Sequence, residues 1–159
     1  MVKITLKILV ILLLVLCQIS LMPKFLILGA IPNLIFIFTI ALVIKNRFWD
    51  ALLMGFLGGI FLDLASSLWF GFYIFVFLLT IVTINFLLLK TIPSPNNLIV
   101  FLIYFASFLF LDLMTFLFIK SWPSWSFLIG AFINSFWAIV IYILIQSKIA
   151  TREEINVNI

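Results

Sequence analysis

The sequence contains no histidine and a single cysteine, Cys17. A disulfide within the chain therefore has no second thiol, and neither a Cys/His metal site nor a Ser-His-Asp triad has the histidine it needs. Charged residues are also scarce, since they make up 9% of the 159 positions, whereas soluble domains carry about 25%. We therefore expect no enzyme activity, no catalytic residue, no cofactor and no metal.

Apolar residues dominate the chain instead. They form 67% of it, with 20 phenylalanines among them, and the mean hydropathy is +1.47. This composition predicts an integral membrane protein. The basic residues lie between the apolar runs and form no patch with aromatic residues, so the net charge of +4 predicts membrane topology and not nucleic-acid binding.

Six apolar runs follow one another along the chain. They cover residues 8–22, 26–44, 49–66, 70–89, 98–119 and 125–145. No small-residue cleavage site follows the first run, so we interpret it as a retained signal anchor. Pro32 and Asn33 interrupt the second run, and because proline is tolerated best where a helix begins, we expect the second span to begin near Pro32 or to tilt through it. The sequence predicts an all-α, polytopic membrane protein, with a bundle of six transmembrane helices in residues 1–147 and a short cytoplasmic tail at 148–159.

The basic residues predict which way the chain crosses the membrane. An even number of spans places both termini on one side, and seven basic residues lie on that side: Lys3, Lys7, Lys45, Arg47, Lys90, Lys148 and Arg152. Lys24 and Lys120 lie on the other side. Because cytoplasmic loops carry the excess of lysine and arginine, we expect a multi-pass protein of the plasma membrane with both termini in the cytoplasm.

The third run contains an acid among glycines, in the stretch GFLGGIFLDLASSLWFG from Gly55 to Gly71. Small or polar residues recur here at four-residue spacing: Ala51, Gly55, Gly59, Asp63, Ser67 and Gly71. On a helix this spacing forms one face, and small residues on such a face let another helix approach closely. We expect this small-residue face to serve helix packing within the bundle or contact with a partner's helix.

Two acids fall inside apolar runs, Asp63 and Asp112, and each lies 14 residues after the start of its run. An aspartate at a helix centre costs about 2.5–3.5 kcal/mol to insert. The acids either face an internal cavity that handles protons or a solute, or they bond to Ser, Thr or Asn on neighbouring helices. The second interpretation is favoured because the runs contain no basic partner. Asn134, between Gly130 and Ala138 at four-residue spacing, is a further polar residue inside the membrane.

These features resemble the family of the bacterial rod shape-determining protein MreD. The resemblance rests on Pro32 and Asn33 at the start of the second span, on basic residues after it, and on the pattern G-F-x-x-G-x-x-x-D-L from Gly55 to Leu64. Further matching positions are Ser66, Gly71, Asp112, Asn134 and Trp137. The resemblance covers nearly the whole chain and includes the six-span order.

The resemblance implies a non-enzymatic scaffold of the cell-elongation machinery, which synthesises peptidoglycan and maintains rod shape, in the bacterial plasma membrane. The implied partners are the transmembrane helix of MreC and, through it, MreB, RodA and a class B penicillin-binding protein, together with membrane lipid. The implied fold is similar to that of the substrate-binding subunits of energy-coupling factor transporters. A second class of function stays open: a membrane-embedded transporter subunit that binds a small solute or vitamin between its helices.

Overall fold

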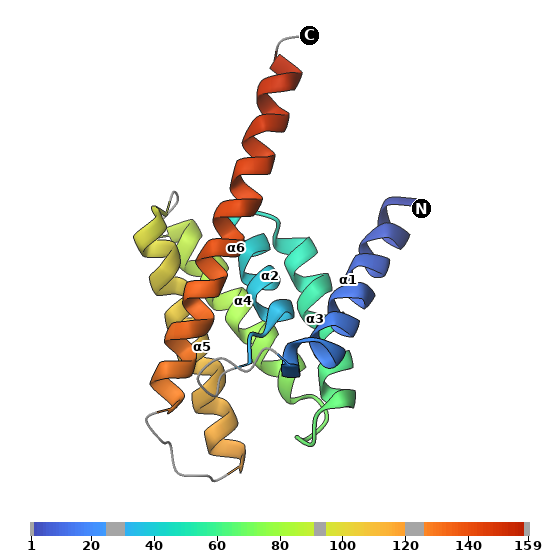
Figure 1. Cartoon of the computed structure of the whole chain (residues 1–159), viewed down its shortest axis with the longest axis vertical. Helices are drawn as coiled ribbons and strands as arrows, with labels where there is room; N and C mark the ends of the chain where they lie inside the picture. Colours follow the sequence, from blue (N-terminus) through green and yellow to red (C-terminus); the bar gives the residue numbers. More distant parts are fainter. Residues whose placement is uncertain (1, 25–30, 91–94, 120–125, 158–159) are drawn as a thin grey trace.

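The computed structural model describes residues 2–24, 31–90, 95–119 and 126–157 (Figure 1). These residues form six α-helices and one short 3-10 helix, and they contain no strand. The helices are α1 (Val2–Ser20), α2 (Leu34–Ile44), α3 (Phe48–Ala65), α4 (Phe72–Lys90), α5 (Asn97–Ile119) and α6 (Ser126–Val157), and the 3-10 helix η1 covers Met22–Lys24. The prediction of an all-α protein is confirmed.

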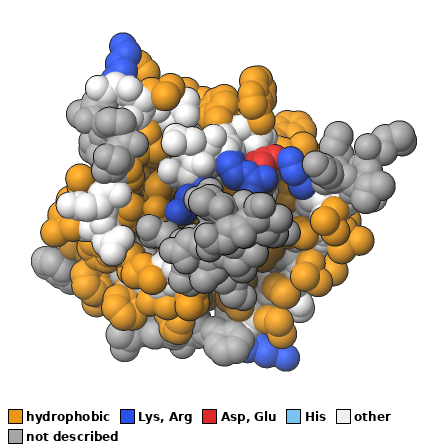
Figure 2. Space-filling view, turned by 90° about the horizontal axis from the view of Figure 1, so that it is seen from above, with side chains coloured by type: hydrophobic (Ala, Val, Ile, Leu, Met, Phe, Trp, Pro, Cys, Tyr) orange, Lys and Arg blue, Asp and Glu red, His pale blue; other side chains and the backbone are white. Residues whose placement is uncertain are grey.

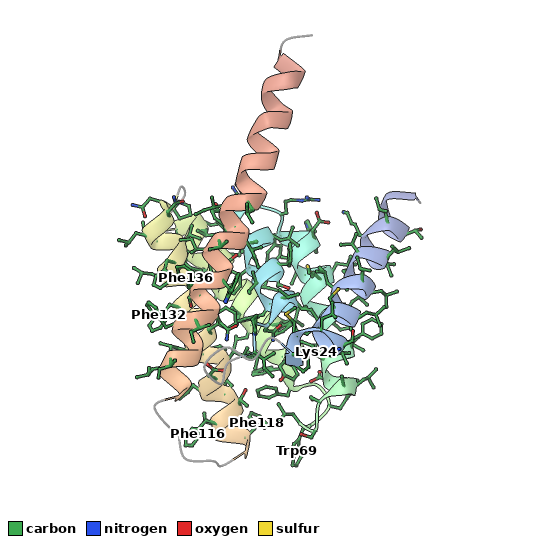
Figure 3. All side chains as sticks on the ribbon, in the orientation of Figure 1. Lys24, Trp69, Phe116, Phe118, Phe132 and Phe136 are labelled. Carbon is green, nitrogen blue, oxygen red and sulfur yellow. The ribbon has the colours of Figure 1, made fainter. Side chains whose placement is uncertain are left out.

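Four segments of the described chain are helical, long and apolar enough to cross a membrane: Thr5–Lys24, Phe48–Ala65, Phe72–Lys90 and Asn97–Phe118. The surface is apolar as well, and Figure 2 shows hydrophobic side chains around the rim of the bundle. Phe132 and Phe136 of α6, for example, are each 56% exposed (Figure 3). Apolar surface of this extent is typical of a protein that lipid surrounds.

The second helix is shorter than the apolar run that contains it. α2 has 11 residues and therefore a length of about 16 Å at about 1.5 Å per residue, whereas the run covers residues 26–44. Residues 26–30 of that run lie outside the described part of the chain. Because a hydrocarbon core is about 30 Å thick, α2 alone is too short to cross it.

Polar side chains close the first turn of α2, where the helix leaves backbone N–H groups without partners. The Asn33 side chain accepts a hydrogen bond from the Phe36 N–H at 3.1 Å. Gln18 of α1 donates to the Pro32 carbonyl at 3.0 Å and accepts from the Leu34 N–H at 2.7 Å. The expected helix start at Pro32 and Asn33 is therefore confirmed, and α1 holds it in place.

α2 lies at the centre of the bundle, against α3 and α4 (Figure 1). Eight of its 11 residues are buried: Ile35, Phe36, Ile37, Thr39, Ile40, Ala41, Val43 and Ile44. A helix that is apolar all round has to be enclosed by other helices or by lipid. Here protein encloses it, and so its length need not match the thickness of the bilayer.

The helices form two groups. α1 to α4 pack closely against one another, and we call them the α1–α4 block; α5 and α6 pack mainly against each other and form the α5–α6 hairpin. Phe36 of α2 stacks on Phe77 of α4, with ring centroids 4.8 Å apart, and meets Phe108 of α5 edge-on at 5.2 Å. The Tyr104 hydroxyl of α5 donates to the Ile37 carbonyl at 3.2 Å. These contacts join the hairpin to the block.

α6 is longer than predicted. The sequence predicts that the sixth span ends at residue 145 and that a tail follows at 148–159, but α6 continues to Val157. Its C-terminal part extends beyond the other helices (Figure 1). The tail is therefore helical as far as residue 157.

Candidate functional site

Asp63 lies near the end of α3 and is 4% exposed. Its carboxyl group accepts three backbone hydrogen bonds, from the N–H groups of Gly71 at 3.0 Å, Tyr73 at 2.8 Å and Ile74 at 3.3 Å. These N–H groups belong to the start of α4, where a helix has unpaired donors and a positive dipole end. Asp63 therefore caps the helix that follows its own and joins α3 to α4.

This arrangement corrects one expectation about the acids. The favoured interpretation was a bond from Asp63 to Ser, Thr or Asn on a neighbouring helix, but its partners are backbone N–H groups of the next helix. A carboxyl group can satisfy several such donors at once because each of its oxygens has two lone pairs. A carboxyl group held in this way acts as a structural clamp between α3 and α4.

The turn between α3 and α4 depends on two of its own residues, Gly71 and Ser66. Gly71 has a φ of +99°, a backbone conformation that costs glycine little and other residues more. The Ser66 hydroxyl oxygen accepts from the Leu68 N–H at 3.3 Å. Together these residues turn the chain so that the start of α4 returns to Asp63.

The small-residue face lies inside the protein for most of its length. Ala51, Gly55, Gly59 and Asp63 are all buried on α3. A Cβ added to Gly55 would lie 2.5 Å from Cδ1 of Ile81, and one added to Gly59 would lie 2.9 Å from both Cα and N of Ile74. The glycines thus let α4 approach the backbone of α3, and helix packing is the use that this face has in the structure.

Two members of the predicted face leave it. α3 ends at Ala65, so the four-residue spacing no longer places Ser67 and Gly71 on the same helical face. Ser67 is exposed in the turn. Conversely, Gly58 was missed: a Cβ there would lie 2.4 Å from Cγ2 of Ile35 in α2. The Gly-Gly pair at 58–59 is the sequence signal for this second packing direction.

The other two polar residues predicted inside the membrane lie on the hairpin. Asp112 is half-buried on α5, and its side chain bonds to no residue that the structure describes. Asn134 on α6 is 7% exposed, and its Oδ1 is buried without a hydrogen-bond partner in the described chain. Both belong to the hairpin, which packs mainly against itself, and neither is brought to Asp63 by a hydrogen bond.

A third acid, Asp50, forms an ion cluster at the opposite end of α3 from Asp63. Its carboxyl group accepts from Lys7 of α1 and from Arg47, which immediately precedes α3. Arg47 and Asp50 belong to one polar break of the sequence, but Lys7 lies 43 positions before Asp50, so the sequence does not indicate that they meet. Packing of α1 on α3 brings them together.

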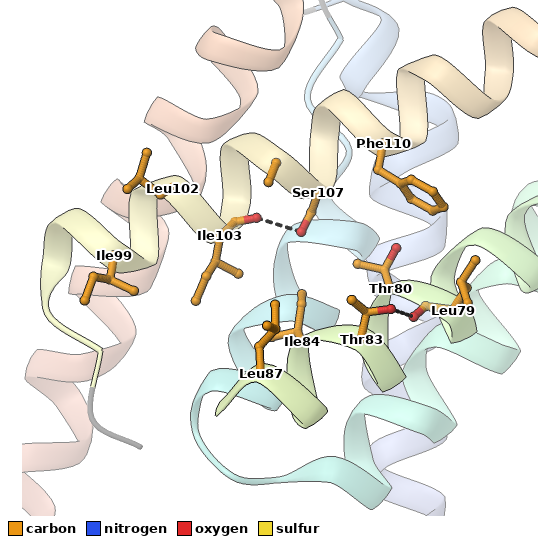
Figure 4. A pocket seen from close by; sticks show the side chains of 11 residues that line it. Leu79, Thr80, Thr83, Ile84, Leu87, Ile99, Leu102, Ile103, Ser107 and Phe110 are labelled. Atoms are coloured by element: carbon orange, nitrogen blue, oxygen red, sulfur yellow. Dashed lines mark hydrogen bonds between the residues drawn. The ribbon is translucent and has the colours of Figure 1, made fainter. Parts of the chain in front are cut away.

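An apolar groove of about 500 Å³ lies between α4 and α5 (Figure 4). Its polar side chains are Thr80, Thr83 and Ser107, and each hydroxyl donates to a carbonyl one turn earlier in its own helix, at 2.7 to 2.9 Å. No hydroxyl donor is left for an occupant. The groove therefore suits an apolar helix or chain better than a hydrated solute.

The described residues also contain no group of three or more His, Cys, Asp or Glu side chains placed to hold a metal ion. The candidate functional features are therefore the turn between α3 and α4 that Asp63 caps, the ion cluster at Asp50, and the apolar groove between α4 and α5.

A scan against family models, a search of curated proteins and a search of solved structures found no match for this chain.

Proposed function

We propose that this chain is a six-span scaffold of the bacterial plasma membrane that binds the transmembrane helix of MreC and serves the cell-elongation machinery. The MreD resemblance in the sequence suggests it, and one observation supports it. The central residues of the resemblance are Gly55, Gly59, Asp63 and Gly71, and all of them take part in the packing of α3 on α4 or in the turn between them. These motif residues pack and cap helices, and a motif with a structural role fits a scaffold better than an enzyme.

The six-span topology rests on the four long apolar helices together with α2 and α6. Lys24 follows α1 and Lys45 follows α2, so the two ends of α2 carry the basic residues of opposite membrane sides. Because α2 is enclosed by protein, it can connect the two sides without matching the bilayer. Both termini then lie in the cytoplasm.

The MreC helix cannot bind the small-residue face, because α4 already covers that face, and so it needs another surface. We place it in the groove between α4 and α5, where Thr83 and Ala106 are among the smaller wall residues. A single transmembrane helix presents an apolar surface with its backbone groups already bonded, and the groove offers the same kind of surface. MreB, RodA and the class B penicillin-binding protein are then reached through MreC.

Co-purification with MreC in mild detergent tests this proposal. Ala106→Phe fills the groove and is expected to abolish co-purification while the chain itself stays folded. Leu113→Phe is the matched control, because Leu113 lies on the same helix, is 45% exposed and does not line the groove. If Ala106→Phe retains MreC, the groove is not the binding site. If the wild-type chain does not bind MreC at all, the scaffold function itself is wrong.

A transporter subunit that binds a small solute or vitamin is the second candidate. The observation in its favour is Asp112, which has no bonding partner among the described residues. Against it, Asp63 is occupied by three N–H groups, and the groove between α4 and α5 has no free hydroxyl. A small molecule retained through purification, together with uptake that Asp112→Asn abolishes without a change in cell shape, would favour this candidate.

A further inference from the structure

A second groove, of about 220 Å³, lies between α1 and α3 at the end of the bundle where α2 turns into α3. Its floor is apolar and includes Val10, Ile11, Leu53 and Met54. Its mouth is formed by the ion cluster of Lys7, Arg47 and Asp50. The groove therefore joins an apolar channel to a charged entrance.

The entrance is positive overall, with two cations and one anion. The exposed fraction of the side chain is 43% for Lys7 and 56% for Arg47, but only 21% for Asp50, so the acid lies beneath the two cations. Figure 2, which looks onto this end, shows an acid flanked by basic side chains. A lysine ammonium has three N–H donors and an arginine guanidinium has five, and one nitrogen of each side chain contacts the Asp50 carboxylate. Donors remain for a second anion.

We propose that this groove binds one anionic phospholipid, with its phosphate on Lys7 and Arg47 and an acyl chain along the apolar floor. Basic pockets between transmembrane helices bind anionic head groups, and arginine matches the geometry of phosphate oxygens. A free phosphate would leave the apolar floor uncovered, and a zwitterionic lipid would not balance the net positive charge. An anionic phospholipid matches both parts of the groove, because its phosphate can contact the basic entrance while its acyl chain covers the apolar floor.

Because the groove lies between α1 and α3, a bound lipid would stabilise the packing of α1 on the block. Among the four described segments long and apolar enough to cross a membrane, the one formed by α1 is the least enclosed, with 11% of it buried, and α1 contributes Ile11 and Val15 to the core. A lipid seated between α1 and α3 adds contacts to the most weakly held helix of the block. Its binding is therefore expected to raise the melting temperature of the protein.

Native mass spectrometry and thermal unfolding of the full chain in mild detergent test the proposal. The probes are phosphatidylglycerol, phosphatidylcholine with the same acyl chains, and inorganic phosphate. One phosphatidylglycerol is expected to bind per chain and to raise the melting temperature, whereas the other two do neither. Equal retention of phosphatidylcholine, or equal stabilisation by phosphate alone, would overturn the proposal.

Variants of the entrance sharpen the test. Lys7→Gln and Arg47→Gln are each expected to weaken phosphatidylglycerol binding about fivefold, the effect of one cation close to anionic lipid. Asp50→Asn removes the competing anion and is expected to strengthen binding. Lys90→Gln is the control, since it changes the net charge equally but lies on α4, outside the groove.

Unchanged binding by Arg47→Gln would contradict the assignment of the phosphate site. Should either variant fail to fold, the wild-type chain still decides the question through salt. Phosphatidylglycerol binding held by two partly exposed cations has to weaken as ionic strength rises. Binding that is insensitive to salt would exclude the charged entrance as its cause.

Discussion

The α1–α4 block and the α5–α6 hairpin differ in the bonding of the acid and amide side chains within their helices. In the block, Asp63 accepts three backbone hydrogen bonds and Gln18 makes two, and each closes the start of a helix. In the hairpin, Asp112 has no bonding partner in the described chain and Asn134 has an unpaired buried oxygen. Asp63 thus stabilises the block through hydrogen bonds, whereas Asp112 and the Asn134 oxygen form no such bonds in the described part of the hairpin. An intramembrane acid cannot be interpreted from its position in a span alone.

Among the substitutions that test this comparison, replacement of Asp63 should reduce the stability of the protein most. Asp63→Ala leaves three partly buried N–H groups without their acceptor, at about 1–3 kcal/mol each, so we expect the free energy of unfolding to fall by about 4 kcal/mol. Thermal unfolding in detergent measures the change. Asp63→Asn keeps one acceptor oxygen and should lie between Asp63→Ala and the wild type. A loss below about 1 kcal/mol for Asp63→Ala would show that the clamp is not needed.

Gly59→Ala tests the close packing of the block. The added Cβ meets the backbone of Ile74, which cannot move without displacing α4, and overpacking of this kind costs about 1–3 kcal/mol. Gly55→Ala is the matched control on the same face, because its Cβ meets the flexible end of the Ile81 side chain. We expect Gly59→Ala to lower the melting temperature clearly more than Gly55→Ala. Equal effects would mean that α3 and α4 can separate at little cost.

The contacts between the hairpin and the block should contribute less to stability than the Asp63 clamp or the packing at Gly59. Tyr104→Phe removes the hydrogen bond to the Ile37 carbonyl while it keeps the ring, so we expect a loss of about 1 kcal/mol. Hydrogen exchange should rise in α5 and α6 and change little in α3 and α4. Tyr73→Phe, whose hydroxyl bonds to no described residue, is the control. Uniform exchange changes throughout the molecule would mean that block and hairpin unfold as one unit.

Asp112→Asn should have the smallest effect on stability. No hydrogen bond to a described residue is lost, so we expect a change of less than about 1 kcal/mol in the free energy of unfolding. Unfolding measured beside Asp63→Asn gives a direct comparison of the two acids. A destabilisation as large as that of Asp63→Asn would remove the distinction between block and hairpin.

Several features were predictable because they depend on neighbours along the chain. Pro32 and Asn33 mark a helix start, since proline lacks the N–H and asparagine can cap the first turn. Gly55 and Gly59 indicate a close helix contact, since only small residues permit it. The bonding partners of Asp63 were not predictable, because the turn at Gly71 brings N–H groups eight to eleven residues away back to its side chain. The contact of Lys7 with Asp50 depends likewise on the packing of α1.

The sequence by itself determined that this is an all-helical membrane protein, where most of its helices lie, and that α3 has a face for close packing. These properties follow from composition and from periodicity within single segments. Only the tertiary structure decided that α4 fills this face, that a short α2 forms the core, and that Asp63 is clamped while Asp112 is not. Each of these depends on which distant segments meet, because a buried polar group is satisfied by whichever donors the fold brings within about 3 Å of it.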